Sequence, residues 1–302
     1  MKRIFIMMIL VSCSLTAYSQ EGKTPEDIQR DKANQDRAAK SNLDTVKTYG
    51  WKHSMVTGLN LTQVSFKDWV GGGENALAYT VWLKGESVQE LEQTEWSNSY
   101  SFDFGQTRVG SQGLRKTDDD IYLQTLLIYK LGSNINPYVS ATLRTQFATG
   151  YNYTDTADIS ISKFFDPAYL TQSAGVAFQP IPEITTRLGA GVREIVTSQY
   201  PQYADDPTTP EIEKVKAQGG LESVTDVKWD FADNMTYAGK LEMFDAFKHM
   251  DQIIVRSDNT VSAKVNKYVS VNFNVQIIND VSVSPLTQIK ESLALGISYI
   301  LL

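Results

Sequence analysis

Cysteine is almost absent from this 302-residue sequence, in which Cys13 is the single one. Disulfide frameworks and cysteine-based metal sites each need several thiols, so the chain can form neither within itself. Long apolar segments are also missing: after the N-terminus, no stretch has the roughly 18 uninterrupted apolar residues that a membrane-spanning helix requires. An excess of positive charge is lacking too, because the net charge is −7. Nucleic acid is therefore not expected as a partner, since phosphates need a basic surface.

The N-terminus has the features of a secretory signal peptide. Positive charge at Lys2 and Arg3 is followed by a short apolar core, and a run of small residues ends at Ser19. We predict cleavage after Ser19, so that residues 1–19 are removed. A second interpretation is a lipoprotein signal, in which Cys13 would be acylated.

Residues 20–50 are polar and charged, with no aromatic residue before Tyr49. Residues 24–27 (Thr-Pro-Glu-Asp) resemble a helix start, with a hydroxyl N-cap, a proline in the first turn and acids near the positive dipole end. The residues that follow offer almost no apolar face for such a helix. Two interpretations remain: a mobile periplasmic tail, or a helix that docks a protein partner.

A period of two in apolar spacing dominates the chain from Trp51 onward. Large apolar residues alternate with small ones from Leu293 to Tyr299, almost at the C-terminus. A last strand with one apolar face is typical of an outer-membrane barrel, because this strand closes the cylinder and contacts lipid. Twelve strands are predicted, at 51–66, 76–86, 95–106, 119–131, 137–149, 168–179, 183–196, 214–232, 235–247, 252–265, 268–279 and 291–302.

The connections between these segments mostly alternate between short and long. Outer-membrane barrels have tight periplasmic turns and longer external loops, and the short connections here all fall on one predicted side. The link 87–94 is longer than a periplasmic turn should be, and the link 248–251 is short for an external loop. Asp258 and Asn259 offer a further turn that would split one strand in two.

Aromatic residues are frequent, with 15 Tyr, 12 Phe and 5 Trp. Many of them lie on the same strand face as the large apolar residues and close to the strand ends. This is where the two interfacial aromatic girdles of a barrel are found. We therefore predict an all-β fold, a transmembrane antiparallel β-barrel of about 12 strands over residues 51–302. The predicted periplasmic girdle contains Trp51, Trp96, Tyr129, Phe178, Trp229, Phe231, Tyr237 and Tyr299, and the other contains Phe66, Trp69, Tyr79, Phe104, Phe147 and Tyr151.

The residues at the alternate positions of each strand point into the lumen. They are polar and include charges of both signs. Eight strands enclose little beyond their own side chains and 16–18 leave a water channel, so twelve lie between these limits. The charges are then either a satisfied salt-bridge lining or a selectivity filter. The charged lumen candidates are Arg144, Arg187, Arg193, Lys240 and Glu242, and the neutral ones include Ser97, Ser99, Ser101, Asn272, Asn274 and Gln276.

Residues for catalysis are scarce. His53 and Ser54 are neighbours on a predicted strand, so their side chains point to opposite faces and cannot form a nucleophile–base pair. His249 with Asp245 and Asp251 resembles a rim protease site only superficially. Residues 118–120 and 205–206 are aspartates that could hold a divalent cation or act as solvated loop charges. We predict that the protein is not an enzyme and has no cofactor.

The first external loop carries a motif of its own, with Trp69, Gly71 and Gly72 followed by Glu74 and Asn75. Such a loop could fold into the lumen as a constriction, or it could only be anchored at the rim of the barrel. With the C-terminal segments 264–270, 279–280 and 288–299, this motif resembles an uncharacterised outer-membrane family common in Bacteroidota. The resemblance implies a β-barrel inserted by the outer-membrane assembly machinery, and it implies no reaction or substrate. Unlike such barrels, this chain does not end on an aromatic residue, so recognition by that machinery would rest on Tyr299.

The sequence thus predicts a protein of the outer membrane of a Gram-negative bacterium, in contact with the lipid bilayer and lipopolysaccharide. The favoured function is a small pore or passive channel. The alternative is a non-conducting accessory barrel that docks a partner protein through residues 20–50 or through its external loops.

Overall fold

The computed structural model describes residues 50–67, 70, 73–154, 157–206, 208–248, 250–266, 268–281 and 284–301. The predicted signal peptide and nearly all of the predicted tail lie outside these residues. The described chain is built almost entirely from strands and has one short 3-10 helix, η1 (Pro201–Tyr203). The strands are β1 (Gly50–Val64), β2 (Ala76–Glu90), β3 (Thr94–Val109), β4 (Arg115–Tyr129), β5 (Ile135–Thr145), β6 (Gly150–Tyr153), β7 (Asp158–Ser162), β8 (Ala168–Ile181), β9 (Ile184–Val196), β10 (Val215–Ala232), β11 (Met235–Ala246), β12 (Ile254–Lys264), β13 (Val269–Asn279) and β14 (Gln288–Ile300).

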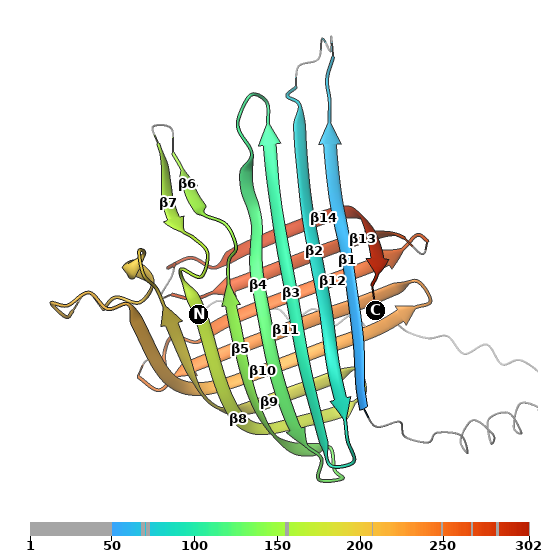
Figure 1. The fold of residues 1–302 in the computed structure, drawn as a ribbon, viewed down its shortest axis with the longest axis vertical. Coiled ribbons are helices and arrows are strands. Elements are labelled where there is room, and N and C mark those ends of the chain that lie inside the picture. The colour runs from blue at the N-terminus through green and yellow to red at the C-terminus, as the bar shows by residue number, and fades with distance from the viewer. Residues whose placement is uncertain are drawn as a thin grey trace, which may run out of the picture. The chain divides into compact units, whose positions relative to one another are not determined.

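Twelve strands form one closed antiparallel barrel, in the order β1-β14-β13-β12-β11-β10-β9-β8-β5-β4-β3-β2. In Figure 1, strands β1 to β5 run along the front of the barrel and β9 to β13 cross behind them at a steep angle. This crossing reflects the tilt that strands adopt when a twisted sheet closes on itself. The predicted barrel and its number of strands are confirmed.

Closure depends on the first and last strands. β1 pairs with β14 from Val56↔Ile300 to Asn60↔Gly296, and the N–H of Leu301 donates to the carbonyl of Met55 at 2.8 Å. By contrast, β1 pairs with β2 along its whole length. Closing the sheet pairs the edge N–H and C=O groups that lipid cannot hydrogen-bond.

The connections alternate between a turn end and a loop end of the barrel. The turn end contains 91–93, 130–134, 182–183, 233–234 and 265–268, together with the end of β14. The link predicted at 87–94 is shorter than expected, because β2 continues to Glu90 and the N–H of Leu91 donates to the carbonyl of Thr94. The predicted strand 252–265 is continuous, and the alternative turn at Asp258 and Asn259 does not form, because both residues are paired within β12.

The loop end has one element that the sequence pattern did not predict. Within the stretch 150–167, strands β6 and β7 form a separate two-stranded hairpin that rises from the rim (Figure 1). Its apolar and aromatic residues are too few for the period of two to stand out in the sequence. The hairpin contacts the next loop, because Ser160 and Tyr200 share a hydrogen bond and the Tyr203 hydroxyl donates to the carbonyl of Ile161 at 3.2 Å.

The outer surface of the barrel is apolar, with aromatic side chains near the turn end. Leu293 is 71% exposed, Trp229 55% and Tyr299 60%. Such exposure has no rationale in water but is the expected state of side chains that face lipid tails and headgroups. Together with the closed sheet, this surface defines a transmembrane β-barrel. No helix in the described part of the chain is long and apolar enough to cross a membrane.

Candidate functional site in the barrel lumen

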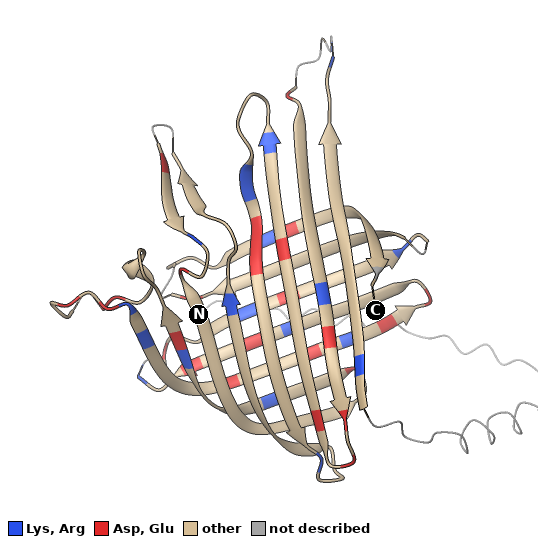
Figure 2. Ribbon diagram, in the orientation of Figure 1, with Lys and Arg blue, Asp and Glu red and all other residues tan. Residues whose placement is uncertain are grey.

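Side chains of alternate parity point into the lumen. On β11, for example, Leu241 is on the outer surface, whereas Lys240 and Glu242 point inward and meet residues of strands on the opposite wall. Charged residues of both signs occur on the front and the back strands (Figure 2). The lumen is therefore polar, and its charges can pair across it.

The most extensive contacts join β11 to β4 and β5. The ammonium group of Lys240 donates to Oε1 of Gln124 at 3.0 Å, and a guanidinium nitrogen of Arg144 lies 3.7 Å from a carboxylate oxygen of Glu242. Strands β8, β9 and β10 separate β5 from β11 along the barrel wall. These contacts therefore cross the interior instead of joining neighbouring strands.

Tyr122 on β4 lies at the centre of this group. Its hydroxyl donates to Gln124 at 2.6 Å and lies 3.5 Å from a carboxylate oxygen of Glu242. The guanidinium of Arg144 lies 4.8 Å from the centre of the Tyr122 ring, and the ammonium of Lys240 lies 5.1 Å from it. Two cations on one aromatic ring are held together here by the carboxylates between them. We call Tyr122, Gln124, Arg144, Lys240 and Glu242 the cross-lumen network.

Arg187 on β9 extends this network toward one wall. Its side chain is only 2% exposed, lies 3.5 Å from Asp226, and packs 5.7 Å from the ring of Tyr138. Asp226 also pairs with Lys240 at 3.3 Å. Beside it, Ser173 donates a short hydrogen bond to Glu222. A buried guanidinium needs such compensation, because an unpaired buried charge costs several kcal/mol.

Two further ion pairs join strands that are not neighbours. Lys290 on β14 lies 2.8 Å from Asp118 on β4, and Arg193 on β9 lies 2.9 Å from Asp280, directly after β13. Together with the cross-lumen network, these two ion pairs connect strands on different sides of the lumen. All five charged lumen candidates thus point inward and have partners of opposite charge. The sequence pattern missed Asp118, Asp226 and Asp280, although the inward parity of Asp226 on β10 was available from it.

The aspartates at 118–120 are strand residues of β4, not loop residues. Asp119 faces outward and is paired with Lys116 at 2.7 Å, and it accepts hydrogen bonds from the N–H groups of Phe147 and Ala148. Asp120 faces Arg144 at 3.7 Å. In the described part of the chain, no group of three or more His, Cys, Asp or Glu side chains is arranged to hold a metal ion.

The loop end is fastened by Asp166. This carboxylate, 2% exposed, accepts hydrogen bonds from the hydroxyl of Thr197 and from the N–H groups of Ser198 at 3.0 Å and Gln199 at 2.7 Å. Burial alone would raise the pKa of Asp166, but these hydrogen bonds outweigh it and hold the pKa below its ordinary value. No sequence pattern indicates this role, because Asp166 lies outside every predicted strand.

The loop motif is described only in part. Trp69, Gly71 and Gly72 lie outside the described residues. Asn75 joins two loops, because its side-chain oxygen accepts from the N–H of Phe66 at 2.6 Å and its carbonyl accepts from the N–H of Gly110 at 2.8 Å. The Glu74 carboxylate lies against Gly110, where a side chain would collide with it. These two motif residues act at the rim.

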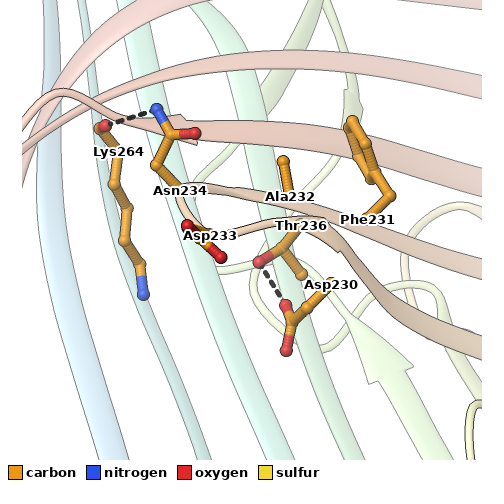
Figure 3. A pocket seen from close by; sticks show the side chains of 7 residues that line it. All are labelled: Asp230, Phe231, Ala232, Asp233, Asn234, Thr236 and Lys264. Carbon is orange, nitrogen blue, oxygen red and sulfur yellow. Dashed lines mark hydrogen bonds between the residues drawn. The ribbon is translucent and has the colours of Figure 1, made fainter. Parts of the chain in front are cut away.

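The histidines do not form a catalytic arrangement within the described chain. His53 lies on the outer surface, where it hydrogen-bonds Ser87 at 2.8 Å and stacks on Trp51. His249 lies outside the described residues. A shallow cavity of about 390 Å³ opens at the β10–β11 turn (Figure 3). Thr236 donates to Asp230 there, and Asn234 donates to the carbonyl of Lys264.

Comparisons with known proteins give a family match over part of the chain and distant structural likenesses. A family model described as "Protein of unknown function (DUF3078)" matches residues 61–151, a segment that contains the loop motif. No curated relative matches the sequence at a significant level. The C-terminal segments named above lie beyond the matched residues.

Solved structures with similar architecture are outer-membrane barrels of low identity. The translocator domain of the autotransporter NalP from Neisseria meningitidis is 10% identical, over 90% of this chain and 95% of that chain, with a TM-score of 0.36. An outer membrane channel from Pseudomonas putida F1 is 12% identical, over 85% and 96%, with a TM-score of 0.38. The NanC porin is 9% identical, over 82% and 98%, with a TM-score of 0.38. At these scores no function is carried over to this chain.

Proposed function

We propose that this protein is a narrow outer-membrane channel whose resting lumen is constricted by the cross-lumen network. The single observation that carries the proposal is the contact of Lys240 and Glu242 on β11 with Gln124 and Arg144 on the opposite wall. Ion pairs can separate and re-form, and they weaken as salt screens them. The network can therefore act both as a constriction and as a gate.

The rest of the proposal concerns where the protein lies. Residues 1–19 act as a signal peptide, the turn end faces the periplasm, and the loop end faces outward. The outer-membrane assembly machinery inserts the barrel, and the rim contacts lipopolysaccharide. The resemblance at the loop motif supports a bacterium of the Bacteroidota as the source. The proposed channel carries out no reaction and needs no cofactor.

Planar-bilayer conductance of the refolded chain from residue 20 onward tests the channel. Glu242→Gln removes the carboxylate that faces Arg144, Tyr122 and Lys240, so we expect larger or more frequent openings in this variant. Glu194→Gln is the matched control, because Glu194 lies on the outer surface beside Gln172. Heat-modifiable migration shows that each chain is folded. Wild-type and variant chains that fold but never conduct would overturn the proposal.

A non-conducting accessory barrel is the second candidate. The ordered loop end favours it, because Asp166 fastens the loop 197–214 to the segment after β7 and so creates a fixed external surface. Docking of a protein through these loops or through residues 20–50 would then be the function. Silent bilayers, together with co-purification of a partner that is lost in Asp166→Ala, would support this candidate.

A further inference from the structure

The seam between the first and the last strand is paired over only part of its length. β1 and β14 pair at five positions, from Val56↔Ile300 to Asn60↔Gly296, whereas β1 and β2 pair at fifteen. On the loop-end side of this pairing, β1 continues through residues 61–64 and β14 through residues 288–295. No backbone hydrogen bond joins these two segments within the described part of the chain. We call the two diverging segments the fork.

An ion pair across the lumen accounts for this divergence. Lys290, which points inward from β14, lies 2.8 Å from Asp118 on β4. Strands β1, β2 and β3 separate β14 from β4 along the wall. The ion pair therefore holds the loop-end part of β14 across the lumen instead of beside β1, and we call it the brace. In Figure 1, β14 runs across the back of the barrel while β1 rises toward the loop end.

The fork begins near the edge of the apolar band. Its first residue on β1, Leu61, pairs on its other side with Tyr79, a residue of the predicted loop-end girdle. Girdle aromatics are most stable where the hydrocarbon meets the headgroups. The fork therefore opens near this boundary, and its closed end, at Asn60 and Gly296, lies one position deeper along β1.

The two faces of the fork differ in polarity. On the outer face, Leu61 is 51% exposed, Leu293 71% and Leu295 59%. Small side chains alternate with them on the lumen face, namely Thr62, Ser292 and Ala294. An apolar border toward the membrane and a small, mostly polar border toward the lumen suit a molecule that has both an apolar chain and a polar head.

The unpaired backbone of the fork needs water. N–H and C=O groups without a partner are not tolerated against hydrocarbon, but they are tolerated where they line a water-filled cavity. The fork is therefore expected to open into the lumen. A strand of another chain could also pair with these groups, but charged side chains on an edge strand disfavour such pairing. Lys290 and Glu291 occupy neighbouring positions on this edge, so an opening into the lumen is the better account.

We infer that the fork is a lateral passage between the lumen and the membrane, and that it takes a single-chain amphiphile. The acyl chain lies in the fork and the polar head lies in the lumen, where Lys84 and Asp103 flank Trp82 on the inward face of the wall. Because the two strands converge at Asn60, a slender acyl chain fits the fork better than a two-chain lipid. This inference rests on the proposed channel for a water-filled lumen, whereas the fork itself does not require conduction.

Pairs of cysteines test the geometry of the fork. A chain from residue 20 onward contains no cysteine, because Cys13 is the single one. Leu61→Cys with Leu295→Cys places thiols at the next outward positions that a longer seam would pair. Leu59→Cys with Ile297→Cys is the matched control, because these residues pair in the existing seam. Under a mild oxidant the control pair should form its disulfide in the folded barrel, and we expect the fork pair to form several-fold less.

Lys290→Met tests the brace. Without the ion pair to Asp118, β14 is free to pair with β1, so the fork pair of cysteines should oxidise nearly as fully as the control pair. Lys84→Met removes another inward lysine, from β2, and should leave the fork pair reduced. Equal oxidation of the fork and control pairs in the unchanged background would overturn the fork. A fork pair that stays reduced in Lys290→Met would overturn the brace.

Dibromostearate in phosphatidylcholine vesicles is the probe for the amphiphile, with unbrominated stearate as the reference. Bromine quenches tryptophan at close range, and Trp82 lies over Gly58, two positions along β1 from the closed end of the fork. The share of quenching due to Trp82 is the difference between a chain and its Trp82→Phe version. Ala294→Phe fills the lumen side of the fork and should reduce this share several-fold. Ala78→Phe is the matched control, because Ala78 pairs with Thr62 on the side away from the fork.

The outcomes separate the lateral passage from the channel. Trp82 quenching that is equal in Ala294→Phe and Ala78→Phe would show that stearate enters by the mouth of the lumen, and it would overturn the lateral passage. Steady KCl conductance without Trp82 quenching would also overturn it and leave the channel intact. A disulfide-linked dimer of the Leu293→Cys chain would overturn it as well, because a second copy would then cover the edge. Quenching that only Ala294→Phe removes, in a barrel that never conducts, would support the fork and overturn the channel.

Discussion

Lys240 on β11 donates a hydrogen bond to Gln124 on β4 at 3.0 Å, and the two residues stand 116 positions apart in the sequence. Four strands of the barrel wall separate β11 from β4 in one direction and six separate them in the other. Their contact fixes the distance between opposite walls at this level of the lumen. A change in this contact should therefore alter both the free energy of unfolding of the barrel and the width of its lumen.

A double-mutant cycle on this pair measures that relationship. Each of Lys240→Met and Gln124→Leu removes a hydrogen bond donated by a charged group, so we expect each to lower the free energy of unfolding by about 1–3 kcal/mol. Lys240→Met should have the larger effect, because Lys240 also pairs with Asp226 at 3.3 Å. The coupling energy should be at least about 0.5 kcal/mol, as for residues in direct contact.

Urea unfolding in detergent, followed by tryptophan fluorescence, gives the four free energies. Strictly additive effects would show that the cross-lumen contact does not form in the folded barrel. Conductance of the same variants should rise as stability falls, because both depend on the same contact.

Gly175 on β8 allows a close approach of two strands. A Cβ atom added there would collide with the backbone of Leu188 and Gly189 on β9. Backbone cannot move aside as a flexible side chain can, so Gly175→Ala should destabilise the barrel by about 1–3 kcal/mol. Gly219→Ala is the control, because the nearest atom to its added Cβ is 3.6 Å away, on Phe247. Equal urea midpoints for the two variants would contradict this prediction.

Much of the fold could be predicted from the sequence, because lipid on one side and water on the other impose a strict period of two on each strand. The errors in strand length have one physical cause. β2 was predicted to end at residue 86, yet Ser87, Val88 and Gln89 pair with β3. Strands extend past the apolar band into the polar interface, where hydrogen bonding continues after the apolar periodicity has ended.

The candidate site could be predicted only in part. Alternation within each strand was enough to place Arg144, Lys240 and Glu242 on the lumen face, because the face of a residue depends only on its position in its own strand. Their partners depend on which strands lie opposite and on the stagger between them, and no local pattern contains this information. Arg193 shows the limit well: its partner Asp280 follows the end of β13, in a stretch where parity no longer applies.

Acid should loosen the loop end through Asp166. Its carboxylate has a lowered pKa in the folded protein because of the hydrogen bonds from Thr197, Ser198 and Gln199. A lowered folded pKa means that the stabilisation is fully present above the unfolded value of about 3.9 and is lost as pH falls through the folded pKa. The barrel itself should remain closed over this range.

Amide hydrogen exchange of Ser198 and Gln199, corrected for the intrinsic pH dependence, measures this loosening. Protection should fall below pH 4 in the wild type and should be weak at all pH values in Asp166→Asn, whose neutral amide is a poorer acceptor. As a reference, amides within β13 should keep their protection in both chains. Wild-type protection of Ser198 and Gln199 that does not change between pH 6 and pH 2 would contradict the prediction.

Tyr299 should control insertion more than stability. It is 60% exposed on the outer surface of β14, and it pairs with Thr57 at the closure of the barrel. Tyr299 is the one aromatic residue of β14, so it is the aromatic residue that the proposed insertion by the outer-membrane assembly machinery would use on this strand. We expect Tyr299→Ala to reduce the amount of barrel in the outer membrane several-fold in cells, while spontaneous refolding into detergent stays nearly unchanged. Tyr129→Ala removes another exposed girdle tyrosine, from β4, and should leave insertion close to the wild-type level. Membrane fractionation and heat-modifiable migration measure the two properties, and an equal loss of insertion in both variants would show that Tyr299 acts only as a girdle residue.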